Sequence, residues 1–177
     1  MRITISGPPG SGKTTVCGLL AERLGIPAVV FGRLFREMAS HKGITLAEMG
    51  ALAEKDRSID ESIDARILEI ARETDSMILE SRLSAQMLQR DGIPAFKLYL
   101  DADPLVRAAR VGKREDEDLQ QAAEAMAQRQ ISEAKRYKQY YDIDLYDLSV
   151  YDLIVDTGDK TPDEIVDEII SILPEEQ

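Results

Sequence analysis

The chain has 177 residues, 44% of them apolar, and a formal net charge of −11. This length suits one domain with a substantial core, and no apolar stretch is long enough to span a membrane. The acidic balance argues against sequence-independent binding to nucleic acid, which requires a basic surface. One cysteine excludes an intrachain disulfide, and the first residues resemble a strand rather than a secretory signal. We therefore expect a cytoplasmic protein.

The first element is a strand over residues 2–6, followed by a glycine-rich loop and a helix. Residues 7–14 match the phosphate-binding pattern G-x-x-x-x-G-K-[ST]. Thr15–Leu24 has helical periodicity and stops at Gly25. A strand, such a loop and a helix N-terminus surround one anion with backbone N–H groups. The sequence therefore predicts that ATP binds at Gly7, Pro8, Pro9, Gly10, Ser11, Gly12, Lys13, Thr14 and Thr15.

Two residues of this loop have predicted roles in the chemistry. We expect Lys13 to reach the β- and γ-phosphates, and Thr14 to offer its hydroxyl to Mg²⁺. Lys13 is therefore a catalytic candidate.

Strand-like runs recur along the chain and alternate with helical patterns. They cover residues 3–6, 28–31, 76–80, 96–100 and 153–156. This alternation predicts one α/β domain over residues 1–177, with a doubly wound, parallel, five-stranded sheet. Ligands are expected at the carboxyl ends of the strands.

Two connecting segments are longer than simple crossovers. Residues 32–75 have room for several short helices, among them one opened by the capping box Thr45–Glu48 and an amphipathic one over 59–71. Residues 103–141 form a charged helical stretch interrupted at 115–118. These segments are either mobile substrate and lid segments or plain helical hairpins. The last helix follows the cap Thr161 and ends at Pro174.

Arginine supplies 14 of the 22 basic residues, and its planar fork suits phosphate oxygens. Arg107, Arg110 and Arg114 follow the fourth strand and would share one helix face. A solvated charged stripe is the alternative explanation. Their place at the carboxyl edge of the sheet favours a phosphate site, so we expect Arg107 or Arg114 to clamp the transferring phosphoryl group.

The second and third strands also end in polar residues. Gly32 allows close backbone approach, and Arg36 lies one turn into the following helix. If the third strand lies beside the first, Glu80 and Arg82 are next to the loop. Glu80 then either binds Mg²⁺-bound water or pairs with an arginine. His41, the only histidine, is interpreted as a surface or helix-end residue.

The combination of motifs resembles the archaeal type of cytidylate kinase over essentially the whole chain. The motifs are Gly7–Thr14, Gly32-x-x-x-Arg36, Leu79–Leu83, Tyr99–Ala102 with the arginine helix, Glu133–Tyr137 and Tyr151–Thr157. The loop alone is shared by many enzymes, whereas the combination is far more specific.

The resemblance implies a P-loop nucleoside monophosphate kinase that transfers the γ-phosphoryl group of ATP to CMP or dCMP with Mg²⁺. It implies an acceptor-binding insertion at about 32–75 and a lid at about 112–134. It matches Arg36, Arg82, Arg129 and Asp156 to the acceptor site, with Gly32 opening that segment. Arg33 departs from the family pattern, which often has an acidic residue there.

The chemistry requires no general base, because the attacking phosphate oxygen is already anionic, so the lack of a catalytic histidine is consistent with it. Alignment and charge compensation suffice. The same chemistry on AMP or UMP remains an alternative, since one sequence does not reveal base choice. A nucleotide-dependent switch is a further alternative, but an Asn-Lys-x-Asp motif is absent from the sequence. We expect a monomer.

Overall fold

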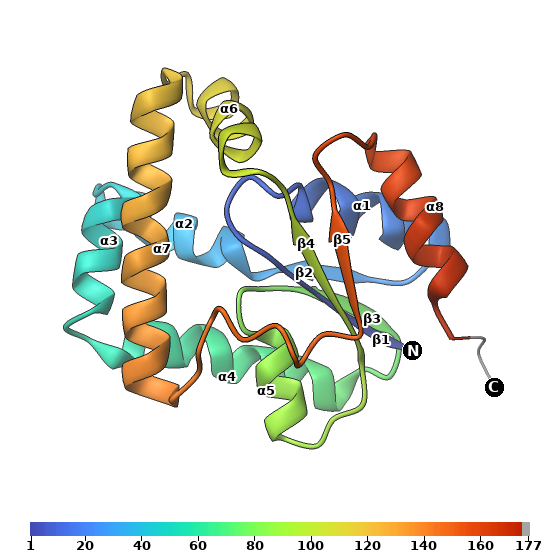
Figure 1. Ribbon diagram of the computed structural model, residues 1–177. Coiled ribbons are helices and arrows are strands. Elements are labelled where there is room, and N and C mark those ends of the chain that lie inside the picture. The colour runs from blue at the N-terminus through green and yellow to red at the C-terminus, as the bar shows by residue number, and fades with distance from the viewer. Residues whose placement is uncertain (175–177) are drawn as a thin grey trace.

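The computed structural model describes residues 1–174, which form a parallel sheet covered by helices on both faces (Figure 1). The strands are β1 (Arg2–Ser6), β2 (Ala28–Val30), β3 (Met77–Glu80), β4 (Phe96–Asp101) and β5 (Leu153–Asp156). The helices are α1 (Lys13–Leu24), α2 (Phe31–Lys42), α3 (Leu46–Ala53), α4 (Arg57–Glu73), α5 (Ser84–Arg90), α6 (Pro104–Glu115), α7 (Leu119–Tyr141) and α8 (Pro162–Ile172).

The strand order is β2-β3-β1-β4-β5, and every neighbouring pair is parallel. β1 lies at the centre, with Ile5 opposite Glu80 of β3 and Ser6 opposite Tyr99 of β4. The carboxyl ends of β1 and β3 are therefore adjacent. This arrangement places the loop after β1 beside Glu80, as the predicted strand order requires.

Alternating side chains along the strands build one core on each face of the sheet. On one face, Ile3 and Ile5 of β1 pack with α1 and α8. On the other, Met77 and Leu79 of β3 pack with Ile67 of α4 and with α5. Because both faces are buried, the strands are apolar on both sides, as expected of a parallel sheet. The predicted doubly wound fold is confirmed.

The core also explains two single residues. Phe31 was expected to end the second strand, but it is the first residue of α2, because its side chain is buried against the α4 side of the sheet. Cys17 of α1 is fully buried, and this burial raises the pKa of its thiol to about 12. The thiol therefore fills space in the core and is unreactive.

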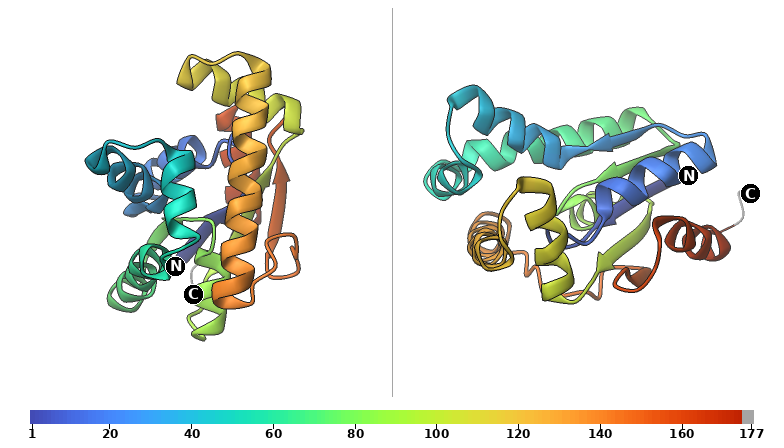
Figure 2. Two further views of the ribbon diagram at one scale, coloured as in Figure 1. Left: turned by 90° about the vertical axis from the view of Figure 1, so that its left-hand side faces the viewer. Right: turned by 90° about the horizontal axis from the view of Figure 1, so that it is seen from above.

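Three helices, α2, α3 and α4, connect β2 to β3. The predicted capping box opens α3, where the Thr45 hydroxyl accepts from the Glu48 backbone and the Glu48 carboxylate accepts from the Thr45 N–H. α3 lies alongside α7, so the connection reaches across the carboxyl edge of the sheet (Figure 2).

Helices α6 and α7 form a hairpin between β4 and β5. The predicted interruption at 115–118 is confirmed, since Asp116 has a left-handed φ of 58° and Asp118 caps α7. α7 then continues to Tyr141, so residue 134, the expected end of a lid segment, lies inside an unbroken helix. Within residues 1–174, no helix combines the length and apolar character that a membrane crossing needs.

Candidate active site

The glycine-rich loop is pressed against β4 and α6. Gly7 has a φ of 146°, and a Cβ atom there would lie 2.1 Å from the Leu100 carbonyl oxygen. Gly10 has a φ of 79°, and a Cβ atom would lie 2.6 Å from the Arg107 carbonyl oxygen. Both the dihedral angles and the close contacts require glycine at positions 7 and 10, so these two residues permit the observed path of the loop.

The loop leads into an uncapped helix N-terminus. Gly12 precedes α1 in the left-handed region, and no side chain in residues 1–174 caps the helix. The first backbone N–H groups of α1 are thus left for an anion. Next to them, Lys13 Nζ donates to the Pro8 carbonyl at 2.8 Å. Removal of its ammonium from water, with repulsion from Arg82 and Arg129, lowers the pKa of Lys13 to about 7 despite the attraction of Glu80.

Thr14 and Glu80 meet at the edge of the same loop. The Thr14 hydroxyl donates to Glu80 Oε2 at 3.0 Å, because β3 lies beside β1 and ends at Glu80. A hydroxyl and a carboxylate oxygen are the hard ligands that Mg²⁺ prefers. Among residues 1–174, no cluster of three or more His, Cys, Asp or Glu side chains is placed to hold a metal. Thr14 and Glu80 together supply two such oxygens at the edge of the loop.

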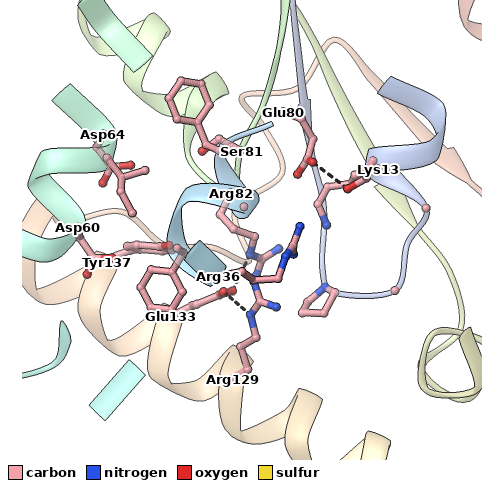
Figure 3. A pocket seen from close by; sticks show the side chains of 18 of the residues that line it. Lys13, Arg36, Asp60, Asp64, Glu80, Ser81, Arg82, Arg129, Glu133 and Tyr137 are labelled. Atoms are coloured by element: carbon pink, nitrogen blue, oxygen red, sulfur yellow. Dashed lines mark hydrogen bonds and ion pairs between the residues drawn. The ribbon is translucent and has the colours of Figure 1, made fainter. Parts of the chain in front are cut away.

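One cleft extends from the glycine-rich loop to α4 (Figure 3). It is lined by the loop, the start of α2, one face of α4, the end of β3 and the facing sides of α6 and α7. Its polar lining comprises Lys13, Thr14, Thr15, Arg36, Asp60, Asp64, Glu80, Ser81, Arg82, Arg114, Arg129, Glu133, Arg136 and Tyr137. Gly32 lines it as well.

Two arginines in the middle of the cleft share one buried carboxylate. Arg82 Nε donates to one oxygen of Glu133 at 2.7 Å, and Arg129 Nε to the other at 2.9 Å. Arg82 also donates to the Gly7 carbonyl. Burial alone would raise the pKa of Glu133, but the two guanidinium groups lower it to about 2. Glu133 is therefore ionised and holds both arginines beside the loop.

The positive charge in the cleft exceeds what the carboxylates compensate. Arg36 has a lowered pKa, because it is partly shielded from water and because Arg129 and Arg114 repel its charge. The cleft is lined by four carboxylates, Asp60, Asp64, Glu80 and Glu133, and by six basic side chains, Lys13, Arg36, Arg82, Arg114, Arg129 and Arg136. A bound anion would relieve the repulsion.

The three arginines of α6 have different contacts. Arg107 is buried, donates from Nε to the Ala102 carbonyl at 2.9 Å and from Nη1 to the Pro9 carbonyl at 3.3 Å, and does not line the cleft. Arg110 donates to both the hydroxyl and the carbonyl of Thr157. Only Arg114 reaches the cleft. In this structure the guanidinium groups of Arg107 and Arg110 therefore serve backbone carbonyls, and Arg114 is the one of the three that lines the cleft.

Asp156 lies apart from the predicted acceptor residues. It ends β5, and its Oδ1 accepts a hydrogen bond from the Gly158 N–H at 2.8 Å. β5 and β2 are opposite edges of the sheet, and Arg36 follows β2. The structure therefore brings Arg36, Arg82, Arg129 and Gly32 together in the cleft and leaves Asp156 outside it.

Several cleft residues were given no role by the sequence reasoning. Glu133, Arg136 and Tyr137 lie in one of the motifs that carry the family resemblance, whereas Asp60 and Asp64 were not singled out. The available signal was their register: Asp60 and Asp64 occupy the same buried face of α4 as Ile67 and Ala71. Acidic side chains on a buried helix face need a partner or a ligand.

Fold and site together define a P-loop phosphotransferase: a glycine-rich loop before a helix N-terminus, a lysine, and arginines around the adjoining cleft. The sequence matches the profile of the cytidylate kinase-like family over residues 2–159, and the chain belongs to this family. It is 46% identical over 159 residues to a cytidylate kinase of Methanocaldococcus jannaschii, with 89% of each chain covered. It is 42% identical over 173 residues to a cytidylate kinase of Halorubrum lacusprofundi, covering 98% of this chain and 89% of that one.

Solved structures support the fold. A shikimate kinase from Bacteroides thetaiotaomicron superimposes with a TM-score of 0.62 at 15% identity, covering 97% of both chains. An uncharacterised protein from Eubacterium ventriosum superimposes with a TM-score of 0.72 at 21% identity, covering 99% of both.

Proposed function

We propose that this protein transfers the γ-phosphoryl group of ATP to CMP or dCMP, giving ADP and CDP or dCDP. The observation that carries the proposal is the single cleft that joins the glycine-rich loop to the cluster of Arg36, Arg82 and Arg129. A donor phosphate on the loop and an acceptor phosphate on this cluster would lie next to each other in such a cleft. Membership of the cytidylate kinase-like family supports the choice of acceptor.

The donor is assigned to the loop. Residues 7–15 would surround its phosphates with N–H groups, and Lys13 would turn from the Pro8 carbonyl to the β- and γ-phosphates. Thr14, backed by Glu80, would hold Mg²⁺, and the two oxygens already lie 3.0 Å apart. The ion, when bound, neutralises developing phosphate charge.

The acceptor phosphate is assigned to Arg36, Arg82 and Arg129. Its oxygen is anionic near neutral pH, so this chain has to align it and compensate its charge rather than remove a proton. Residues 32–75 would then serve as the acceptor-binding segment. Residues 112–134 would serve as the lid that excludes water on closure.

Among the arginines of α6, Arg114 is the proposed clamp on the transferring group. It lines the cleft, and the one ion pair that it makes within residues 1–174, with Glu115, is exposed, so it is available to move. Arg107 is proposed to support the loop at Pro9. We assign no acceptor contact to Asp156.

A panel of nucleoside monophosphates with ATP and Mg²⁺ tests the proposal. ADP formation should be stimulated strongly by CMP and dCMP. A preference for AMP or UMP would identify the alternative acceptor, and slow hydrolysis indifferent to every acceptor would contradict the kinase. The small size and the single buried cysteine support a cytoplasmic monomer as part of the same proposal.

A further inference from the structure

Beyond the arginine cluster, the cleft ends in a small polar and aromatic chamber. Asp60 and Asp64 enter it from α4, and Arg136 and Tyr137 enter it from α7. Figure 3 shows the order along the cleft: Lys13 at one end, the arginines in the middle, and the two aspartates at the other end. A nucleotide whose phosphate lies on the arginines, with its other end away from Lys13, would place its base in this chamber.

Asp64 is the group in this chamber whose carboxylate has only one of its two oxygens hydrogen-bonded within residues 1–174. Its side chain is 8% exposed, and Oδ2 accepts a hydrogen bond from the Tyr141 hydroxyl at 2.7 Å. Its other oxygen, Oδ1, receives no hydrogen bond from residues 1–174. Burial raises the pKa of Asp64 to about 7, although the Tyr141 bond opposes the shift. A hydrogen-bond donor at Oδ1 would stabilise the ionised carboxylate.

Asp60, by contrast, is fully engaged. Arg136 Nε donates to Asp60 Oδ2 at 2.8 Å, and both side chains are buried. Arg136 Nη1 also donates to the Ser132 hydroxyl at 2.8 Å. A guanidinium carries five N–H donors, and these bonds, with a longer one from Nη2 to Asp60, use three. Arg136 therefore still has donors to offer to a ligand.

The chamber also has flat apolar walls. The Arg136 guanidinium lies 5.6 Å from the centre of the Phe35 ring and 5.5 Å from that of Tyr137. Phe35, Tyr137 and Ile63 all line the cleft. Aromatic and aliphatic walls suit a planar base, whose edge would then meet the carboxylate of Asp64 and the guanidinium of Arg136.

We propose that Asp64 selects the acceptor base, accepting a hydrogen bond at Oδ1 from the exocyclic 4-amino group of cytosine while Arg136 donates to the ring N3 or O2. Cytosine presents this donor, whereas uracil presents a carbonyl oxygen at the same position. With the carboxylate ionised, as it is above its pKa of about 7, two acceptors would face each other there without a proton between them. This inference rests on the proposed function and adds the residue that distinguishes CMP from UMP.

The test is a cycle of two proteins and three acceptors. The wild type and Asp64→Asn are assayed for kcat/KM with CMP, UMP and 2-pyrimidinone ribonucleoside 5′-monophosphate, which lacks only the 4-amino group. For the wild type, loss of that amino group should lower kcat/KM roughly 10- to 100-fold, as expected for a bond to a charged acceptor. In Asp64→Asn, kcat/KM for CMP and for the pyrimidinone should become nearly equal. The ratio of kcat/KM for UMP to that for CMP should rise, since an amide can donate to a carbonyl.

Controls separate base reading from damage to the fold. Asp91→Asn changes an aspartate paired with Arg72 on the surface, far from the cleft lining, and should leave all three ratios unchanged. KM for ATP should stay the same in Asp64→Asn. The wild-type comparison of CMP with the pyrimidinone needs no variant, so it decides the matter even if Asp64→Asn folds poorly.

The outcomes distinguish the two proposals. Equal kcat/KM for CMP and the pyrimidinone in a wild type that phosphorylates CMP would overturn the role of Asp64 and leave the proposed function intact. An unchanged preference for CMP over UMP in folded Asp64→Asn would also overturn the role of Asp64 and leave the proposed function intact. A wild type that phosphorylates none of the pyrimidine nucleotides would overturn the proposed function, and this inference with it.

Discussion

Glu133→Gln is the perturbation that best tests how the arginine cluster is held. Glu133 is 4% exposed and accepts from both Arg82 and Arg129. Its pKa falls from an ordinary 4.5 to about 2, and each pKa unit corresponds to about 1.4 kcal/mol. The ionised carboxylate therefore contributes about 3 kcal/mol to the free energy of unfolding. This agrees with the ~3–5 kcal/mol lost when one partner of a buried ion pair is removed.

The sign of the pH dependence follows from the lowered pKa. The contribution is fully present above the unfolded-state pKa, near 4.5, and is lost as the pH falls through the folded-state value of about 2. Glu133→Gln should therefore lose about 3 kcal/mol at pH 7 and progressively less below about pH 4. For a chain of this size, the melting temperature should fall by roughly 6–12 °C.

Urea denaturation at several pH values measures this effect, and Glu69→Gln is the matched control. Glu69 pairs with Arg66 on an exposed face of α4, with side chains 56% and 49% exposed, and such pairs contribute ~0–1 kcal/mol. Inorganic phosphate should restore more stability to Glu133→Gln than to the wild type, because the anion replaces the missing charge. A loss no larger than that of the control, or no extra stabilisation by phosphate, would refute the reasoning.

Four further predictions address the loop, α6 and the core. Lys13→Ala should lower kcat by more than about 10³-fold. The free energy of unfolding should be unchanged or higher, because burial already disfavours the charged ammonium. Phosphoryl transfer near the wild-type rate would contradict this prediction. The pKa of Lys13 is about 7 without ligand, and a bound polyphosphate should raise this pKa. ATP binding near pH 7.5 should therefore take up protons, which calorimetry in buffers of different ionisation enthalpy detects. A binding enthalpy that does not depend on the buffer would argue against contact between Lys13 and the phosphates. Arg114→Ala should reduce kcat at saturating substrates by about 10²-fold or more without loss of stability. Arg107→Ala should instead lower the free energy of unfolding by about 1–3 kcal/mol, because it leaves backbone carbonyls unpaired. Turnover of Arg114→Ala within about twofold of wild type would remove Arg114 from the mechanism. Ile67→Ala, at a fully buried position, should cost about 2–5 kcal/mol in chemical denaturation, and a cost below about 1 kcal/mol would show that the α4 side of the core is loosely packed.

Local rules were sufficient to predict most of the fold. The alternation of β-branched runs with helical periodicity predicted the parallel sheet, and the caps at Thr45 and Thr161 formed as their sequences indicate. The strand boundary at Phe31 was wrong because a tertiary contact, burial against α4, decided it. Local pattern carries no information about such a contact.

The site was less predictable, because it depends on which elements face one another. Spacing by three and four residues along α6 suggested one phosphate face, but Arg107 and Arg110 donate to backbone carbonyls of the loop and of Thr157. Asp64 and Glu133 come from helices that meet only in the folded chain. The shifted pKa values of these two carboxyl groups follow from their burial and from the number of hydrogen-bond donors that each one meets. Neither property is visible in one sequence.

The most direct test of the central claim is a crystal structure of the protein with a non-hydrolysable ATP analogue, Mg²⁺ and CMP. We expect the analogue's phosphates at Lys13 and Thr14, the CMP phosphate within hydrogen-bond distance of Arg36, Arg82 and Arg129, and the cytosine amino group on Asp64. A CMP bound with its phosphate away from these arginines, or with its base outside the chamber formed by α4 and α7, would contradict the account.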